Sequence, residues 1–93
     1  MIKISENVRS AHHDEGAILL DISGGKIYGL NPVASRILVL LAQGLNESQI
    51  KSEISRAFST DIETVGRDVD EFLAQLTKQN LATQNGRTVR NIP

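Results

Sequence analysis

The sequence predicts a compact α+β domain, with strands in its first third and helices in the remainder. Short runs of branched apolar residues, separated by glycines, occupy the region before residue 31. Beyond it, apolar residues recur at three- and four-residue intervals, which is the period of an amphipathic helix. The chain has 93 residues, a length that suits one domain with a modest hydrophobic core.

The amino-acid composition of the chain limits the classes of function that it can have. Hydrophobic residues make up 40% of the chain and charged residues 23%, as in a globular protein. The net charge of −1 disfavours nucleic-acid binding, which needs a basic surface. The absence of cysteine excludes disulfides and fits a reducing compartment. Because no signal peptide and no membrane-spanning run is recognisable, we expect a cytoplasmic protein without membrane association.

Two adjacent apolar runs predict a β-hairpin. They cover residues 17–22 and 26–30, and the glycine pair at 24–25 can adopt positive φ. If these glycines form a two-residue loop, Ile22 pairs with Ile27. One face then carries Ile18, Leu20, Ile22 and Ile27, and the other carries Leu19, Asp21, Tyr28 and Leu30. Since both faces are partly apolar, we expect more than one side of the sheet to be covered.

A further strand is expected before this hairpin. It lies within residues 7–13 and is joined through Asp14, Glu15 and Gly16, where glycine eases the turn. The sequence therefore predicts three antiparallel strands in consecutive order, with residues 26–30 at an edge.

Local signals mark where the first two helices begin and end. Asn31 suits the N-cap, Pro32 the first helical position, and Gly44 the stop. Asn46 and Gln49 have the spacing of a capping box at the second helix. Leu45 and Ile50 are placed to form a hydrophobic staple at its start. The expected buried face of this helix consists of Ile50, Ile54, Ala57 and Phe58.

The third helix is predicted to be the longest. Thr60 with Glu63, or Asp61 alone, caps its start, and Asn80 provides a left-handed stop. Leu81 is then placed against Leu76. The apolar positions of this third helix are Ile62, Val65, Val69, Phe72, Leu73 and Leu76. We expect the domain to cover residues 1–83, followed by a flexible polar tail at 84–93.

Several segments together resemble the PqqD family. They are GAILLD at 16–21, GKIYGLN at 25–31 and RDVDEFL at 67–73, followed by Leu76 and Leu81. Leu30-Asn31-Pro32 after a hairpin is the most specific part, and the ordered combination carries more weight than any single segment. The resemblance covers roughly residues 8–82.

This resemblance implies a winged-helix-like fold with three antiparallel strands before three helices. It also implies a recognition element for ribosomally synthesised, modified peptides (a RiPP recognition element), which binds the leader region of a precursor peptide. Such proteins act as peptide chaperones and deliver the precursor to a modifying enzyme or a leader peptidase. We expect a stand-alone member without cofactor or enzymatic activity, in natural product biosynthesis of the lasso peptide or pyrroloquinoline quinone kind, with the lasso type favoured.

The residues themselves are compatible with such a role, because an edge strand can accept a peptide as an additional strand. The predicted peptide-binding residues are Lys26, Ile27, Tyr28, Gly29 and Leu30 on the edge, with Val69, Asp70, Leu73 and Ala74 on the third helix and Arg67 as a charged rim. Which flank of the helix faces the edge stays open. Val69 and Leu73 also suit the core, Tyr28 ordinary sheet packing, and Arg67 and Asp70 a solvated face.

Other functions find less support. His12 and His13 are neighbours in a strand and point to opposite faces, so they do not share a metal ion. Residues 23–26 contain glycines and a lysine without the spacing of a phosphate-binding loop. A winged helix-turn-helix DNA binder is the first alternative, but residues 61–78 carry five acidic and two basic side chains, which repel phosphate. A homodimerisation module is the second alternative.

Overall fold

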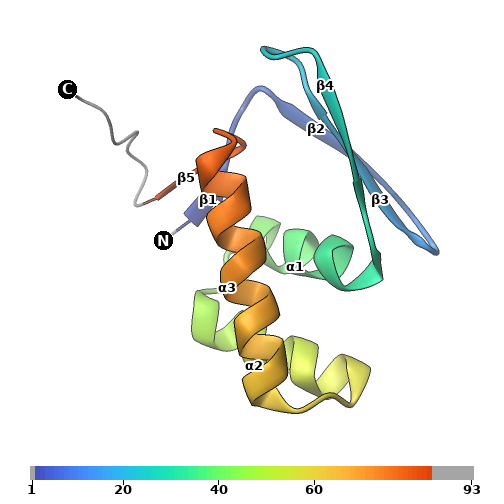
Figure 1. Cartoon of the computed structure of the whole chain (residues 1–93), viewed down its shortest axis with the longest axis vertical. Coiled ribbons are helices and arrows are strands. Elements are labelled where there is room, and N and C mark those ends of the chain that lie inside the picture. The colour runs from blue at the N-terminus through green and yellow to red at the C-terminus, as the bar shows by residue number, and fades with distance from the viewer. Residues whose placement is uncertain (1, 85–93) are drawn as a thin grey trace.

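In residues 2–84, which the computed structural model describes, four strands precede three helices and a fifth strand follows them (Figure 1). The elements are β1 (Ile2–Ile4), β2 (Val8–His13), β3 (Gly16–Asp21), β4 (Lys26–Leu30), α1 (Pro32–Ala42), α2 (Glu47–Phe58), α3 (Ile62–Lys78) and β5 (Ala82–Gln84). The antiparallel order β2-β3-β4 confirms the predicted three-stranded sheet and the edge position of β4.

A second, two-stranded ribbon joins the two ends of the described chain. β1 pairs with β5 in antiparallel fashion, with Ile2 opposite Gln84 and Ile4 opposite Ala82. Neither strand was predicted from the sequence, because three residues are too few to show an alternating pattern. Gln84, which was assigned to a flexible tail, is the last residue of β5, and the rest of that predicted tail lies outside the described residues.

The β3–β4 hairpin differs from the predicted register by two residues. Asp21 pairs with Lys26 and Leu20 with Ile27, so the loop has four residues rather than two. Asp21 closes this loop, because its Oδ1 accepts a hydrogen bond from the Gly24 N–H at 3.1 Å and its carbonyl accepts one from the Gly25 N–H at 2.8 Å. A shift of two residues preserves the assignment of side chains to faces, so the predicted faces are correct.

The two faces of the sheet have different surroundings. The inner face packs on the helices, and Ala17 and Leu19 are each only 1% exposed. On the outer face, the exposed fraction is 46% for Ile18, 39% for Leu20 and 72% for Ile27. The expectation that both apolar faces would be covered is therefore not met by residues 2–84.

The helix termini confirm the predicted local signals. The Asn31 side chain accepts from the Ala34 N–H at 2.8 Å, and Asn46 with Gln49 forms a reciprocal capping box. Asp61, the second of the two predicted candidates, is the N-cap of α3. Further along, α1 ends before Gly44 at φ 90°, and α3 ends before Asn80 at φ 63°, as predicted. The Leu81 N–H then donates to the Leu76 carbonyl at 2.8 Å.

One continuous core fills the space between the helices and the inner sheet face. Ile37, Ile50, Ile54 and Val69 are its most buried helical residues. The prediction was wrong for the residues around the α2–α3 connection: Ala57 is exposed, and Phe58 and Ile62 are 39% and 50% exposed. This connection lies at the end of the molecule away from the sheet, where no other described element covers it (Figure 1).

A candidate peptide-binding groove between β4 and α3

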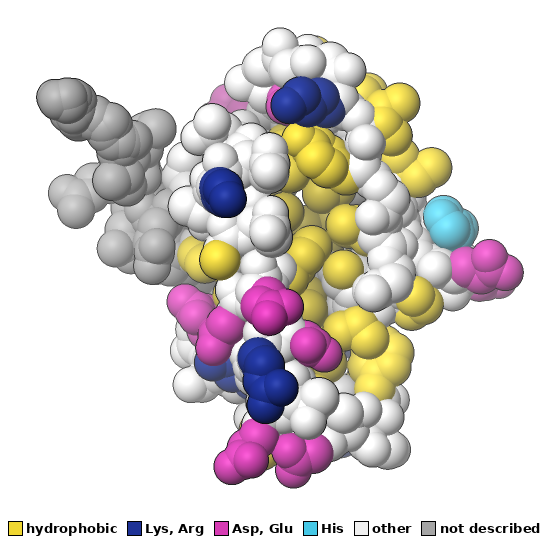
Figure 2. Space-filling model, viewed as in Figure 1, with side chains coloured by type: hydrophobic (Ala, Val, Ile, Leu, Met, Phe, Trp, Pro, Cys, Tyr) yellow, Lys and Arg dark blue, Asp and Glu magenta, His cyan; other side chains and the backbone are white. Residues whose placement is uncertain are grey.

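Two hollows lie beside α3, one along its middle and one at its end. The first, of about 510 Å³, lies between the start of α1 and α3, and the second, of about 470 Å³, lies between the start of β4 and the end of α3. We call them together the β4–α3 groove. Figure 2 shows a hydrophobic strip exposed between the two elements. The groove is therefore open to solvent and runs beside the sheet edge.

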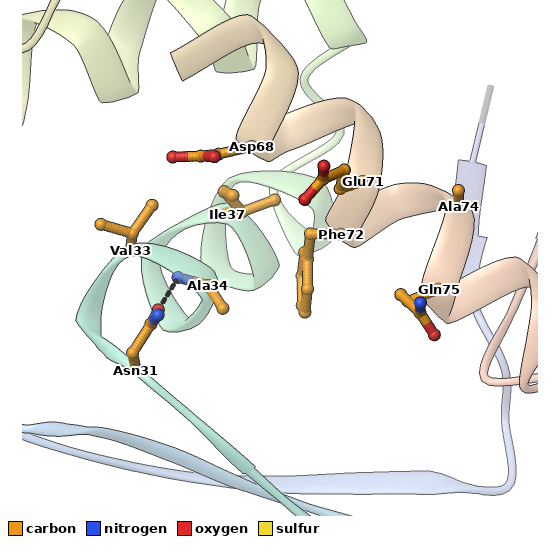
Figure 3. A pocket seen from close by; sticks show the side chains of 9 residues that line it. All are labelled: Asn31, Val33, Ala34, Ile37, Asp68, Glu71, Phe72, Ala74 and Gln75. Atoms are coloured by element: carbon orange, nitrogen blue, oxygen red, sulfur yellow. Dashed lines mark hydrogen bonds between the residues drawn. The ribbon is translucent and has the colours of Figure 1, made fainter. Parts of the chain in front are cut away.

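Partly buried apolar side chains form the walls of the groove. Tyr28, Val33 and Phe72 line the hollows, pack against the core and keep part of their surface accessible. The Phe72 ring projects from α3 into the first hollow, opposite α1 (Figure 3). Such apolar walls offer contact area to the side chains of an extended ligand.

The edge of β4 also presents backbone hydrogen-bonding groups. The Ile22 N–H donates to the Asn7 carbonyl at 3.0 Å, so even-numbered residues of β3 direct their backbone groups towards β2. By alternation along an antiparallel strand, odd-numbered β3 residues face β4, and their partners Lys26, Tyr28 and Leu30 face β3. The N–H and C=O groups of Ile27 and Gly29 therefore point to the open edge.

The five predicted residues of β4 thus divide into two sets. Lys26, Tyr28 and Leu30 place their side chains on the inner face, where Lys26 and Tyr28 line the second hollow. Ile27 and Gly29 place theirs on the outer face, where a Cβ added to Gly29 would meet no atom within 4 Å. Ile27 and Gly29 can therefore contribute to a peptide site through their backbone alone.

The structure places the predicted residues of the third helix in different surroundings. Val69 and Leu73 are 0% and 3% exposed and belong to the core. Asp70 lies on the flank facing α2, where its Oδ1 is 3.0 Å from the Lys51 Nζ. Ala74 lines the groove and also a hollow on that other flank. Arg67 is exposed.

The flank of α3 that faces β4 was not identified from the sequence. Its groove-lining residues are Asp68, Glu71, Phe72, Ala74 and Gln75, joined at the helix end by Lys78 and Gln79. Most of them share one stripe at helical spacing. The sequence shows this stripe beside the buried one, but only the packing of α3 on α1 and α2 decides which flank remains open.

The two ends of the groove carry opposite charges. Asp68 and Glu71 line the end near the start of α1. Lys26 and Lys78 line the other end, together with Asp21. Figure 2 shows Asp and Glu side chains gathered along the lower part of α3 and Lys or Arg side chains beside the upper end of the hydrophobic strip.

The two histidines are separated as expected. His12 lies on the inner side, with its Nδ1 2.9 Å from the Ser35 Oγ, whereas the His13 Nδ1 accepts from the Glu15 N–H at 3.3 Å. Within residues 2–84, no three His, Cys, Asp or Glu side chains are grouped in a way that would hold a metal ion. In the same part of the chain, no helix has the length and apolarity needed to cross a membrane.

Comparison with known proteins gives two kinds of match. The model of the family described as coenzyme PQQ synthesis protein D (PqqD) matches residues 16–82. A solved structure described as TbiB1 in complex with the TbiA(beta) leader peptide is 39% identical, with a TM-score of 0.80 over 91% of this chain and 96% of that one. Comparison with curated protein sequences finds no significant match.

A second solved structure shares the fold. It is described as lasso peptide synthetase B1 complexed with the leader peptide, and it is 20% identical. Its TM-score is also 0.80, over 89% of this chain and 98% of that one.

Proposed function

Because the chain belongs to the PqqD family, we propose that it binds the leader region of a ribosomally synthesised precursor peptide and presents it to a partner enzyme. The observation that carries this proposal is the open β4 edge beside an apolar groove, in a chain 39% identical to a protein solved with a leader peptide. The role is recognition rather than catalysis. We favour a lasso-type pathway, with a leader peptidase as the partner.

The proposed mode of binding is strand addition. A peptide in extended conformation pairs with the free N–H and C=O groups of Ile27 and Gly29 and so extends the sheet beyond β4. Its alternate side chains then enter the groove and contact Tyr28 and Phe72. Backbone pairing supplies affinity with little sequence preference, and the groove supplies selectivity.

We propose that the peptide runs antiparallel to β4. All pairs in this sheet are antiparallel, and antiparallel pairing is slightly more stable per residue than parallel pairing. The N-terminal part of the bound segment then lies near Asn31, and its C-terminal part near Lys26. The outer sheet face is on the opposite side and stays accessible when the groove is filled.

The decisive experiment is an amide NMR titration of the ¹⁵N-labelled protein with the TbiA(beta) leader peptide. We expect saturable shift changes along Lys26–Leu30 and on α3 at Glu71, Phe72 and Gln75. A scrambled peptide of the same composition serves as the control. Saturable changes confined to the Asp70 and Lys51 flank would contradict the groove, and no changes at millimolar peptide would contradict leader binding.

A pair of substitutions at Gly29 isolates the contribution of the edge. Gly29→Pro removes the N–H that faces the peptide, and we expect leader affinity to fall at least about tenfold, because a backbone bond is lost and the proline ring obstructs the approach. Gly29→Ala keeps the N–H and adds a methyl group in open space, so affinity should stay within about twofold. Circular dichroism checks that both variants fold, and equal affinities would refute strand addition at β4.

A further inference from the structure

The β4–α3 groove has a charge asymmetry along its length, and we propose that it selects the direction and the charge pattern of the leader. A basic side chain near the N-terminal end of the bound segment lies against Asp68 and Glu71. An acidic side chain near its C-terminal end lies against Lys26 and Lys78. This inference rests on the proposed leader binding and specifies the chemistry of the peptide.

The acidic end is formed by two carboxylates on the open flank of α3. Asp68 and Glu71 are exposed, line the first hollow and project from α3 on the side where α1 begins (Figure 3). Neither forms an ion pair within the described residues. By contrast, the neighbouring Asp70 on the other flank is paired with Lys51. Arg67 is exposed beside them on α3, so two carboxylates and one guanidinium leave this end net negative.

The basic end is formed jointly by the strand and the helix. Lys26 and Lys78 are exposed and line the second hollow, and neither is ion-paired in residues 2–84. Asp21 also lines this hollow, and its Oδ1 accepts the Gly24 N–H. Two ammonium groups therefore face one carboxylate in this hollow, which leaves it net positive. Lys78 also borders the hollow on the other flank of α3, which Glu47 and Asp70 line.

The separation of the two ends makes them distinguishable to a peptide. Along α3, Glu71 and Lys78 are seven residues apart, which corresponds to about 10 Å at roughly 1.5 Å per residue. Surface charges are screened over about 8 Å at physiological ionic strength. Each end therefore acts on the nearest peptide charges, and a reversed peptide meets like charges at both ends.

Paramagnetic relaxation enhancement tests the direction. Two versions of the TbiA(beta) leader peptide carry a nitroxide on a cysteine added at the N-terminus or at the C-terminus, and the protein has no thiol to exchange with the label. The N-terminal label should broaden the amides of Val33, Ala34 and Glu71. The C-terminal label should broaden those of Gly25, Lys26 and Lys78. The opposite assignment would overturn the proposed direction.

Charge-reversed variants test the electrostatic contribution. We expect Glu71→Lys and Lys78→Glu each to weaken binding by about three- to tenfold at low salt, because attraction becomes repulsion. Both effects should shrink in 0.5 M NaCl, which a purely structural defect would not do. Asp70→Lys, the same charge change on the other flank, should stay within about twofold of wild type.

The outcomes separate this inference from the proposed function. Wild-type binding with no loss in Glu71→Lys and Lys78→Glu overturns the charge pattern and leaves leader binding intact. A loss in Asp70→Lys equal to that in Glu71→Lys shows that net charge, rather than the groove, governs affinity. Failure of the wild-type protein to bind overturns the proposed function itself.

Discussion

Gly16 is a residue whose backbone decides how the edge strand meets the first helix. It is buried at the start of β3 with φ 146°, and a Cβ built on it would collide with the Leu30 carbonyl oxygen. Only glycine permits this approach, which brings the end of β4 against the start of β3. The position of the β4–α3 groove relative to the sheet therefore depends on a residue that lines none of it.

Replacement of Gly16 should be costly for this reason. We expect Gly16→Ala to lower the free energy of unfolding by about 2–3 kcal/mol, since the added methyl group requires both backbone strain and displacement of Leu30. Gly66→Ala is the matched control within α3, where the new methyl group meets only the Lys51 side chain at 3.7 Å and 3.9 Å. That variant should gain about 0.5–1 kcal/mol from helix propensity. Urea unfolding followed by circular dichroism measures both changes, and equal effects would contradict the steric explanation.

The two phenylalanines of the chain allow a groove position to be compared with an exposed position elsewhere. Phe72 lines the groove and packs against the core, whereas Phe58 is 39% exposed near the α2–α3 connection. We expect Phe72→Ala to weaken binding of the TbiA(beta) leader peptide by about tenfold or more, as for a central aromatic contact. Phe58→Ala should leave affinity unchanged. Calorimetric titration well below the unfolding midpoint measures both, and a similar loss in the two variants would exclude a specific role for Phe72.

At the scale of elements, the helix caps are built from side chains within a few residues of the backbone groups that they satisfy. Asn46 accepts from the Gln49 N–H at 2.9 Å, and the Gln49 Oε1 accepts from the Asn46 N–H at 2.8 Å. Such contacts depend on spacing alone. This is why the sequence predicts the start of α2 to the residue.

The capping box makes a measurable contribution to stability. Asn46→Ala should lower the free energy of unfolding by about 1 kcal/mol, because the Gln49 N–H loses its acceptor. Ser48→Ala, at an exposed position in the same first turn, is expected to change it by less than about 0.5 kcal/mol. Thermal and urea denaturation provide the values. A smaller effect for Asn46→Ala than for Ser48→Ala would show that the cap is dispensable.

Elements that depend on contacts distant in sequence were harder to predict. The β3–β4 register required the Asp21 carboxylate to bind the Gly24 N–H, a bond that competes with the two-residue loop favoured by the glycine pair. β1 and β5 acquire their structure only by pairing with each other across the chain. The open flank of α3 follows from how the helix packs, which periodicity alone does not determine.

At the scale of the whole molecule, the sheet separates two surfaces. The inner face supports the core and the β4–α3 groove, and the outer face exposes Ile18, Leu20 and Ile27. The sequence predicted this division correctly although its register was wrong, since a shift of two residues leaves every side chain on its face. An apolar face of this kind commonly marks a contact surface in a soluble protein.

Because the groove and the outer face lie on opposite sides of the sheet, we expect side chains of the outer face to have little effect on leader affinity. Ile27→Thr keeps the backbone groups at the edge and a branched side chain, and it changes only a group that is 72% exposed on the outer face. We expect affinity for the TbiA(beta) leader peptide to stay within about twofold of wild type in fluorescence anisotropy. A tenfold loss would indicate that the peptide reaches the outer face.

Along β4, residues with side chains on the inner face alternate with residues that offer backbone groups at the open edge. This alternation affects how new ligand preferences can arise. Backbone N–H and C=O groups are identical for nearly every amino acid, so substitutions at Ile27 or Gly29 leave the pairing chemistry largely unaltered. In the proposed mode of binding, selectivity then depends on the accessible side chains of the groove, which include positions 68, 71 and 75 of α3. Exchanging these three residues together with matched charges in the peptide offers a route to orthogonal protein–leader pairs that share one unchanged scaffold.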